Sequence, residues 1–100
     1  MRYNSLIIIP TYNEAENIEL IINKIISIDN SNDVLVVDDN SPDGTSEIVN
    51  NLNNIHDSRV FLIKRDKKSG LGSAYRTGFK WALDNKSVSY THLTLPTKAS

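Results

Sequence analysis

The feature that most constrains this chain is a continuous apolar run, residues 34–37, that ends abruptly in two acidic residues and a turn sequence, residues 38–45. An uninterrupted apolar run is typical of a strand that is buried on both faces of a parallel sheet. In open α/β sheets, ligands bind in the crevice beyond the carboxyl ends of the strands. We therefore expect Asp38 and Asp39 to lie at the edge of a binding crevice.

Shorter signals on both sides of this run predict an alternation of strands and helices. Apolar runs at residues 5–9 and 60–63 are typical of buried strands. Apolar residues at helical spacing predict three helices, which begin near Glu14, Thr45 and Ser73. The resulting order βαβαβα predicts an α/β fold with a parallel sheet and right-handed crossovers.

Local patterns also predict how these helices begin and which faces they bury. Asn13 and Glu16 resemble a capping box for the first helix, and Asp43 or Thr45 is the expected cap of the second. The side chains expected to face the sheet are Ile18, Ile21, Ile22, Ile25 and Ile26 in the first helix, Ile48, Val49, Leu52 and Ile55 in the second, and Ala74, Phe79 and Ala82 in the third.

The composition excludes several classes of function. A net charge of −1 argues against an electrostatic nucleic-acid binder, although basic residues between Lys64 and Lys80 could hold a smaller anion such as a diphosphate. The absence of cysteine removes disulfides, thiolate metal sites and thiol catalysis, and it is compatible with the cytoplasm. The apolar run at residues 6–9 is too short for a signal-peptide core or a membrane span, so we expect a protein that is neither secreted nor integral.

The two adjacent aspartates each have a ligand-binding and a structural interpretation. Because successive side chains of a strand point to opposite faces, Asp38 and Asp39 are not expected to share one site. A carboxylate at this edge could accept a hydrogen bond from a nucleobase or a ribose hydroxyl. It could instead cap the turn that follows. The ligand interpretation is the stronger one for Asp39, and the structural interpretation is the stronger one for Asp38.

Residues 10–14 occupy the place where a dinucleotide-binding fold has its glycine-rich phosphate loop, yet they contain no glycine. A diphosphate is therefore not expected to approach this backbone as closely as it does in an NAD enzyme. Tyr12 could cover a base, and Thr11 and Glu14 could bond to base or ribose edges. The alternative is a helix-start loop with a half-buried tyrosine and a glutamate that pairs with the helix dipole.

A Gly-Leu-Gly sequence, residues 70–72, precedes the third predicted helix. With Lys67 and Lys68 before it, this segment could cradle a phosphate at the amino end of the helix. Two glycines alone favour the alternative, a flexible turn with solvated lysines. Gly70 is kept as a candidate for binding.

Three segments, in this order, resemble the amino-terminal half of family 2 glycosyltransferases, and most closely the polyprenol-phosphate (dolichol-phosphate) mannosyltransferase type. They are residues 7–18 (IIIPTYNEAENI), 36–45 (VVDDNSPDGT) and 70–79 (GLGSAYRTGF). The resemblance implies a GT-A fold, which is a three-layer α/β/α, Rossmann-like arrangement that binds nucleotide-diphospho-sugars. It also implies an inverting transfer of a hexose, typically mannose from GDP-mannose, to a lipid phosphate.

The same resemblance assigns roles to individual residues. Pro10, Tyr12, Glu14 and Asp39 would contact the nucleotide, Val37 would line the base pocket, and the segment from Gly70 to Gly78 would help to shape the donor site. Together with the candidates from the residues themselves, the predicted nucleotide-sugar-binding set is Pro10, Thr11, Tyr12, Glu14, Val37, Asp38, Asp39 and Gly70. No catalytic residue and no metal ligand are assigned in this chain.

The resemblance also implies a cofactor and partners that this chain does not hold alone. In the family, an acidic D-x-D motif after the next strand binds Mg²⁺ or Mn²⁺, and this sequence contains no D-x-D. We therefore expect an active parent that transfers sugar from GDP-mannose to a polyprenol or dolichol phosphate, and an inactive 100-residue chain. The parent would be cytoplasmic and would meet the membrane surface only through its lipid acceptor.

Two other functions fit the same residues. One is a different family 2 transferase that uses a UDP-sugar for glycan or lipopolysaccharide synthesis. The other is a non-catalytic nucleotide-binding module. A donor screen separates the first from the mannosyltransferase, and a cooperative melt that responds to nucleotide supports the second.

Residues 88–100 break the pattern of the rest of the chain. All 12 acidic residues and every Asn and Ile precede Val88, and the tail is rich in threonine. This string resembles the conceptual translation of a transposase adapter used in short-read sequencing libraries. We therefore divide the chain into a nucleotide-sugar-binding part, residues 1–87, and a non-native or disordered tail, residues 88–100, which is excluded from functional reasoning. The alternative is a genuine fourth strand or a disordered terminus.

Overall fold

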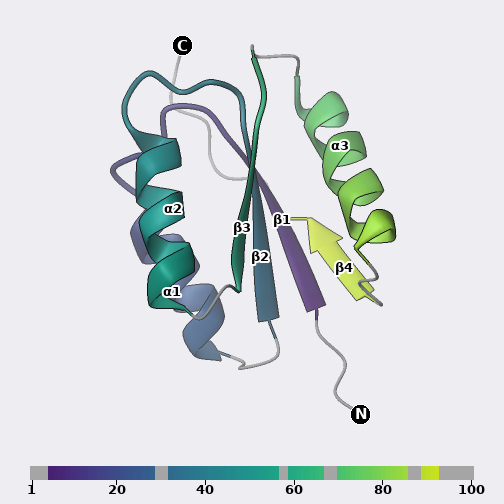
Figure 1. Ribbon diagram of the computed structural model, residues 1–100, viewed down its shortest axis with the longest axis horizontal. Coiled ribbons are helices and arrows are strands. Elements are labelled where there is room, and N and C mark those ends of the chain that lie inside the picture. The colour runs from purple at the N-terminus through teal and green to yellow at the C-terminus, as the bar shows by residue number, and fades with distance from the viewer. Residues whose placement is uncertain (1–4, 29–31, 57–58, 67–69, 86–88, 93–100) are drawn as a thin grey trace.

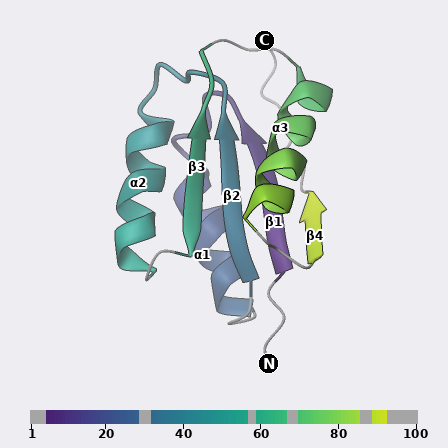
Figure 2. The same cartoon turned by 45° about the vertical axis from the view of Figure 1, so that its right-hand side comes forward.

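The apolar runs of the sequence form one parallel sheet in the computed structural model, which describes residues 5–28, 32–56, 59–66, 70–85 and 89–92. The strands are β1 (Ser5–Thr11), β2 (Asn32–Asp38), β3 (Val60–Lys64) and β4 (Ser89–His92). Their spatial order is β3-β2-β1-β4, and each neighbouring pair is parallel. The strand arrows in Figure 2 therefore all point toward the same end of the molecule.

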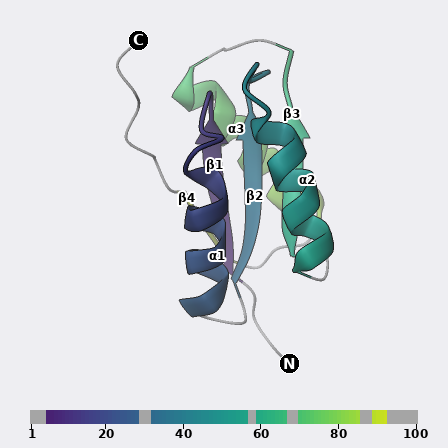
Figure 3. The ribbon, with the colours of Figure 1, turned by 90° about the vertical axis from the view of Figure 1, so that its left-hand side faces the viewer.

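Three helices cover the two faces of this sheet. They are α1 (Ile18–Ile28), α2 (Thr45–Ile55) and α3 (Leu71–Asp84). Helices α1 and α2 lie on one face and α3 lies on the other (Figure 1). Figure 3 shows α1 and α2 side by side across their face. The predicted three-layer α/β/α arrangement with a parallel sheet is therefore confirmed.

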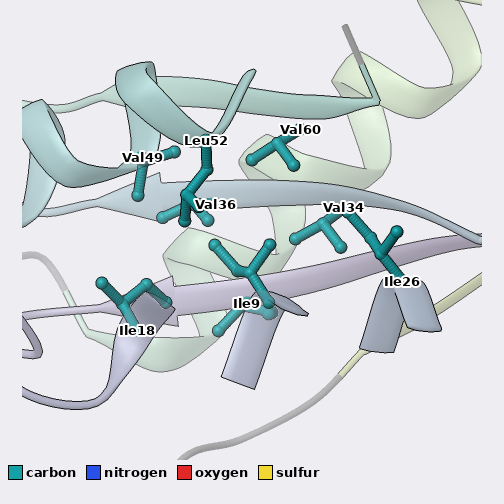
Figure 4. Packing of buried hydrophobic residues seen from close by; sticks show 9 residues of the cluster. Ile9, Ile18, Ile26, Val34, Val36, Val49, Leu52 and Val60 are labelled. Atoms are coloured by element: carbon teal, nitrogen blue, oxygen red, sulfur yellow. The ribbon is translucent and has the colours of Figure 1, made fainter. Parts of the chain in front are cut away.

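Side chains alternate along β1 and β2 between two apolar clusters. Ile9, Val34 and Val36 pack against α1 and α2 (Figure 4), whereas Leu6, Ile8, Leu35 and Val37 pack beneath α3. Because helices cover both faces of these strands, successive residues in the middle of each strand are apolar and do not alternate with polar ones. Full burial of one such side chain contributes about 1.5–3 kcal/mol. The two clusters thus fix the strands that carry the candidate site.

Helix α1 buries the predicted stripe but begins later than predicted. Ile18, Ile22 and Ile26 are buried, as the helical spacing predicts. The helix begins at Ile18, however, and not near Glu14. The expected capping box is wrong because Asn13 adopts a left-handed conformation (φ 58°) and its N–H donates to the Ser41 hydroxyl at 2.8 Å. A contact with the loop after β2 therefore replaces the local cap.

Helix α2 begins at Thr45, as predicted, but it differs from the prediction in its cap and in the last residue of its stripe. Its N-cap is Gly44, in a left-handed conformation (φ 90°), so neither Asp43 nor Thr45 is the N-cap residue, although the Asp43 carboxylate accepts the N–H of Thr45, the first residue of the helix. Glycine reaches this conformation without the steric cost that other residues incur. Val49 and Leu52 are buried, but Ile55 is 66% exposed, so the inner stripe ends one turn earlier than predicted.

Strand β4 lies in the segment that the sequence analysis set apart. It pairs with β1 from Ser5↔Ser89 to Ile8↔His92, and it forms the edge of the sheet beside β1. This strand agrees with the alternative expectation of a genuine fourth strand, and residues 93–100 lie outside the described part of the chain. The foreign origin of residues 88–100 stays a prediction. A gene sequence from longer reads tests it, and a reading frame that still contains residues 90–93 would overturn it.

Candidate functional site

The carboxyl ends of β1 and β2 bring most of the candidate residues to one edge of the sheet. The strand register places Pro10 beside Val37 and Thr11 beside Asp38. Beyond the last pair, the N–H of Asp39 donates to the carbonyl of Thr11 at 3.1 Å. Candidates that are 27 or more positions apart in the sequence are therefore adjacent across a single strand pair.

Asp38 is the centre of a buried hydrogen-bond network on the α2 side of this edge. Its side chain is completely buried. The carboxylate accepts hydrogen bonds from the Thr11 hydroxyl (2.6 Å), from the Ser41 N–H and hydroxyl (2.9 and 2.6 Å), and from the Ser46 hydroxyl (3.1 Å). Hydrogen bonds to a carboxylate are stronger than neutral ones and offset the cost of burying its charge. Asp38 thus ties β1, β2, the following turn and α2 together.

Asp43 makes a second connection between the loops that follow β1 and β2. Its carboxylate accepts the Ala15 N–H (3.0 Å) and the Thr45 N–H and hydroxyl (3.2 and 2.5 Å), and the Thr45 hydroxyl accepts the Glu14 N–H (3.2 Å). Desolvation by burial raises the pKa of Asp43, but the hydrogen bonds from Thr45 and Ala15 outweigh it and leave the pKa below its ordinary value of 3.8. The two loops are therefore held as one unit.

Asp39 is paired on the opposite side of the sheet, toward α3. Arg65, which follows β3, binds both oxygens of Asp39: Nε lies 2.6 Å from Oδ1 and Nη2 lies 3.0 Å from Oδ2. Its Nη1 donates to the hydroxyls of Ser73 (2.7 Å) and Thr77 (3.3 Å) in α3. The hydrogen bond to Asp39 raises the pKa of Arg65. Asp38 and Asp39 therefore have different partners in different layers, as strand alternation predicts.

The remaining candidates lie around this edge in different environments. Tyr12 is 40% exposed, whereas Glu14 and Pro10 are buried. Gly70 is the N-cap of α3, with a φ of 93° and no side-chain cap. The side chain of Val37 is completely buried in the cluster beneath α3. Its contact with a nucleotide base therefore stays a prediction.

Apart from Thr11, sequence reasoning did not identify the polar residues that hold the two aspartates. Ser41 and Ser46 follow Asp38 in the chain, and Arg65 and Ser73 lie on the α3 side. A usable signal existed for Arg65, because it lies just beyond the strand predicted at residues 60–63 and the carboxyl ends of parallel strands share an edge. Its partner could not be read from spacing, since Asp39 lies 26 positions away.

The described residues do not fit the metal that the family resemblance implies. Within residues 5–28, 32–56, 59–66, 70–85 and 89–92, no group of three or more His, Asp or Glu side chains could hold a metal ion. Nor does any helix in this part of the chain have the length and apolar character needed to cross a membrane.

Comparisons with known proteins agree on one family. The family model described as "Glycosyl transferase family 2" matches residues 6–87. Over 79 residues, or 79% of this chain, the sequence is 46% identical to a polyprenol monophosphomannose synthase of Mycolicibacterium smegmatis and 44% identical to an undecaprenyl-phosphate mannosyltransferase of Micrococcus luteus. These alignments cover 30% and 32% of the two relatives, so the chain spans about a third of their length.

A solved structure gives the same result at the level of the fold. A mannosyltransferase from Pyrobaculum calidifontis, in complex with GDP-Man and Mn²⁺, superimposes with a TM-score of 0.72 and 31% sequence identity. The match covers 82% of this chain and 25% of that chain. The similarity in fold therefore extends over most of this chain.

Proposed function

Because this chain belongs to glycosyl transferase family 2, we propose that it forms the donor-binding part of a polyprenol-phosphate mannosyltransferase whose donor is GDP-mannose. Both relatives are named for mannose and for a polyprenyl carrier. The structural neighbour contains GDP-Man. Each finding concerns a protein that is much longer than this chain, so the activity is proposed for the parent.

The observation that carries the proposal is the joined carboxyl edge of β1 and β2. The loop after β1 and the turn after β2 are connected through Asp38 and Asp43, and they present Tyr12 and Asp39 at the same edge. In the proposed complex, Tyr12 covers the base and Asp39 accepts hydrogen bonds from the base or the ribose. One hydrogen bond to a carboxylate contributes about 1.5–3 kcal/mol. Because the loops are already fixed, little ordering is needed when the nucleotide binds.

We propose that the parent also needs a divalent cation and a lipid-phosphate acceptor. The structural neighbour holds Mn²⁺, and the names of the relatives specify a polyprenyl phosphate or its mannosylated product. A cation of this kind neutralises the departing nucleoside diphosphate when it is bound. Because the described residues of this chain do not form such a site, they are assigned only to donor binding. The parent would then meet the cytoplasmic face of a membrane through its acceptor.

Isothermal titration of this chain with GDP, GDP-mannose and UDP-sugars tests the proposal. We expect the guanine nucleotides to bind more tightly than the UDP-sugars. The Asp39→Asn substitution should weaken GDP binding by about tenfold or more because one charged acceptor is lost. Asp84→Asn, a change of the same kind at the far end of α3, should leave the affinity unchanged. Tighter binding of a UDP-sugar, or no nucleotide binding by the folded chain, would contradict the assignment.

A further inference from the structure

The guanidinium of Arg65 connects three elements at the candidate site. It follows β3, binds both oxygens of Asp39 beyond β2, and donates to Ser73 and Thr77 in α3. The side chains of Arg65 and Asp39 are only 13% and 9% exposed. A planar guanidinium that binds a carboxylate through two parallel hydrogen bonds restricts its orientation more than a lysine does. Arg65 and Asp39 therefore form a mostly buried ion pair with a fixed geometry.

The arrangement determines how Asp39 can meet a ligand. An ionised carboxylate has about four acceptor positions on its two oxygens. Arg65 takes one position on each oxygen from a single side. A nucleotide N–H or O–H must then approach the carboxylate from another direction. The orientation of the guanidinium thus sets the direction from which Asp39 receives its ligand.

Helix α3 in turn holds the guanidinium. Ser73 accepts a hydrogen bond from Nη1, and Thr77 accepts a second bond while its own hydroxyl donates to the Ser73 carbonyl at 3.1 Å. These contacts place the far side of Arg65 against the first turns of α3. The Arg65 backbone N–H is also fixed, since it donates to the Asp38 carbonyl at 2.7 Å.

We propose that Arg65 is a positioning residue for the donor nucleotide: anchored by Ser73 and Thr77, it holds the Asp39 carboxylate in the orientation that receives the base or ribose. This inference rests on the proposed function, because it requires a nucleotide at Asp39. Arg65 acts through Asp39 and not through a contact of its own with the ligand. Its removal must therefore have no effect on nucleotide affinity when Asp39 can no longer accept the bond.

Titration of the chain with GDP tests this in two steps. Arg65→Lys keeps the positive charge but loses the bidentate contact with Asp39. This substitution should raise the dissociation constant for GDP about tenfold. The double substitution Ser73→Ala with Thr77→Val keeps the ion pair but removes its anchors, and it should raise the constant by about threefold. Arg59→Lys alters another arginine that pairs with an aspartate, Asp33 at the opposite end of the sheet, and should have no effect.

The second step repeats both changes in the Asp39→Ala background, which has no side-chain acceptor at this position, and there neither change should weaken binding further. Losses that add to that of Asp39→Ala would show that Arg65 acts independently of Asp39 and would overturn the inference. A structural role alone would lower the unfolding midpoint of Arg65→Lys while the folded protein kept its affinity, which would also overturn it. If the wild-type chain is folded and binds no nucleotide, the proposed function fails and this inference fails with it. If Asp39→Asn weakens binding and the Arg65 variants do not, only this inference fails.

Discussion

At the scale of single residues, two adjacent aspartates at one sheet edge have different tasks. Asp38 is completely buried and is satisfied by backbone and hydroxyl donors from three segments, β1, the following turn and α2, whereas the Asp39 carboxylate pairs with Arg65. The structural interpretation of Asp38 therefore has direct support. Its contact with a nucleotide stays a prediction.

The Asp38→Asn substitution should destabilise the fold. An amide has one oxygen acceptor, so its NH₂ group would face a buried donor such as the Ser41 N–H, which now donates at 2.9 Å. A buried donor that loses its acceptor costs about 1–3 kcal/mol. Urea unfolding should show this loss as a lower midpoint, while Asp84→Asn, an exposed control, should stay within about 0.5 kcal/mol of the wild type. Equal midpoints for both variants would contradict the role given to Asp38.

The sequence could predict where these residues lie but not what holds them. The alternation of side chains along a strand was enough to predict that Asp38 and Asp39 point to opposite faces of the sheet. The partner of Asp39 depends on how β3 and α3 pack beside β2, which no local pattern encodes. Long-range pairing of this kind is the part of the site that required the structure.

At the scale of secondary-structure elements, the interiors were predictable, whereas the start of α1 and the cap of α2 were not. The apolar runs and helical stripes located each of β1, β2, β3, α1, α2 and α3, because burial on a face produces a regular sequence period. The beginning of α1 was misplaced because the backbone of residues 13–15 bonds to the loop after β2 and not to a local cap. Helix ends therefore depend on tertiary contacts that the sequence period does not contain.

The close approach of α3 to β1 depends on a glycine. A Cβ at Gly78 would lie 2.6 Å from Cγ2 of Ile8, a side chain that is completely buried. Gly78→Ala should therefore destabilise the protein by about 1–3 kcal/mol through overpacking, despite the higher helix propensity of alanine. Gly72→Ala in the same helix is the matched control: its Cβ meets only Arg76 Nη1 at 3.5 Å, so it should be neutral or stabilising by up to about 1 kcal/mol. Thermal unfolding of both variants measures the difference, and a loss of stability in Gly72→Ala alone would contradict this packing.

At the scale of the whole molecule, the site is one edge of an open sheet. The three-layer arrangement, its parallel strands and the position of the candidate residues followed from the alternation of strands and helices. The cluster beneath α3 and the cluster beneath α1 and α2 support this edge from both sides. The candidate residues are therefore positioned by apolar packing on both faces of the sheet.

Without the rest of a transferase, this edge should bind a donor but not catalyse transfer. The 100-residue chain should bind GDP-mannose but transfer no mannose to a polyprenyl phosphate. It spans about a third of the relatives, its sequence has no D-x-D, and its described residues form no metal group that could neutralise the leaving diphosphate.

Transfer of labelled mannose into the lipid fraction, with Mn²⁺ and polyprenyl phosphate in detergent, measures this directly. The Mycolicibacterium smegmatis polyprenol monophosphomannose synthase serves as the active control, and the chain without acceptor serves as the blank. Binding by titration together with counts at the level of the blank would separate donor recognition from chemistry. Labelled product above the blank that disappears in Asp39→Asn would contradict the prediction, because it would mean that this edge alone can stabilise the departing nucleotide.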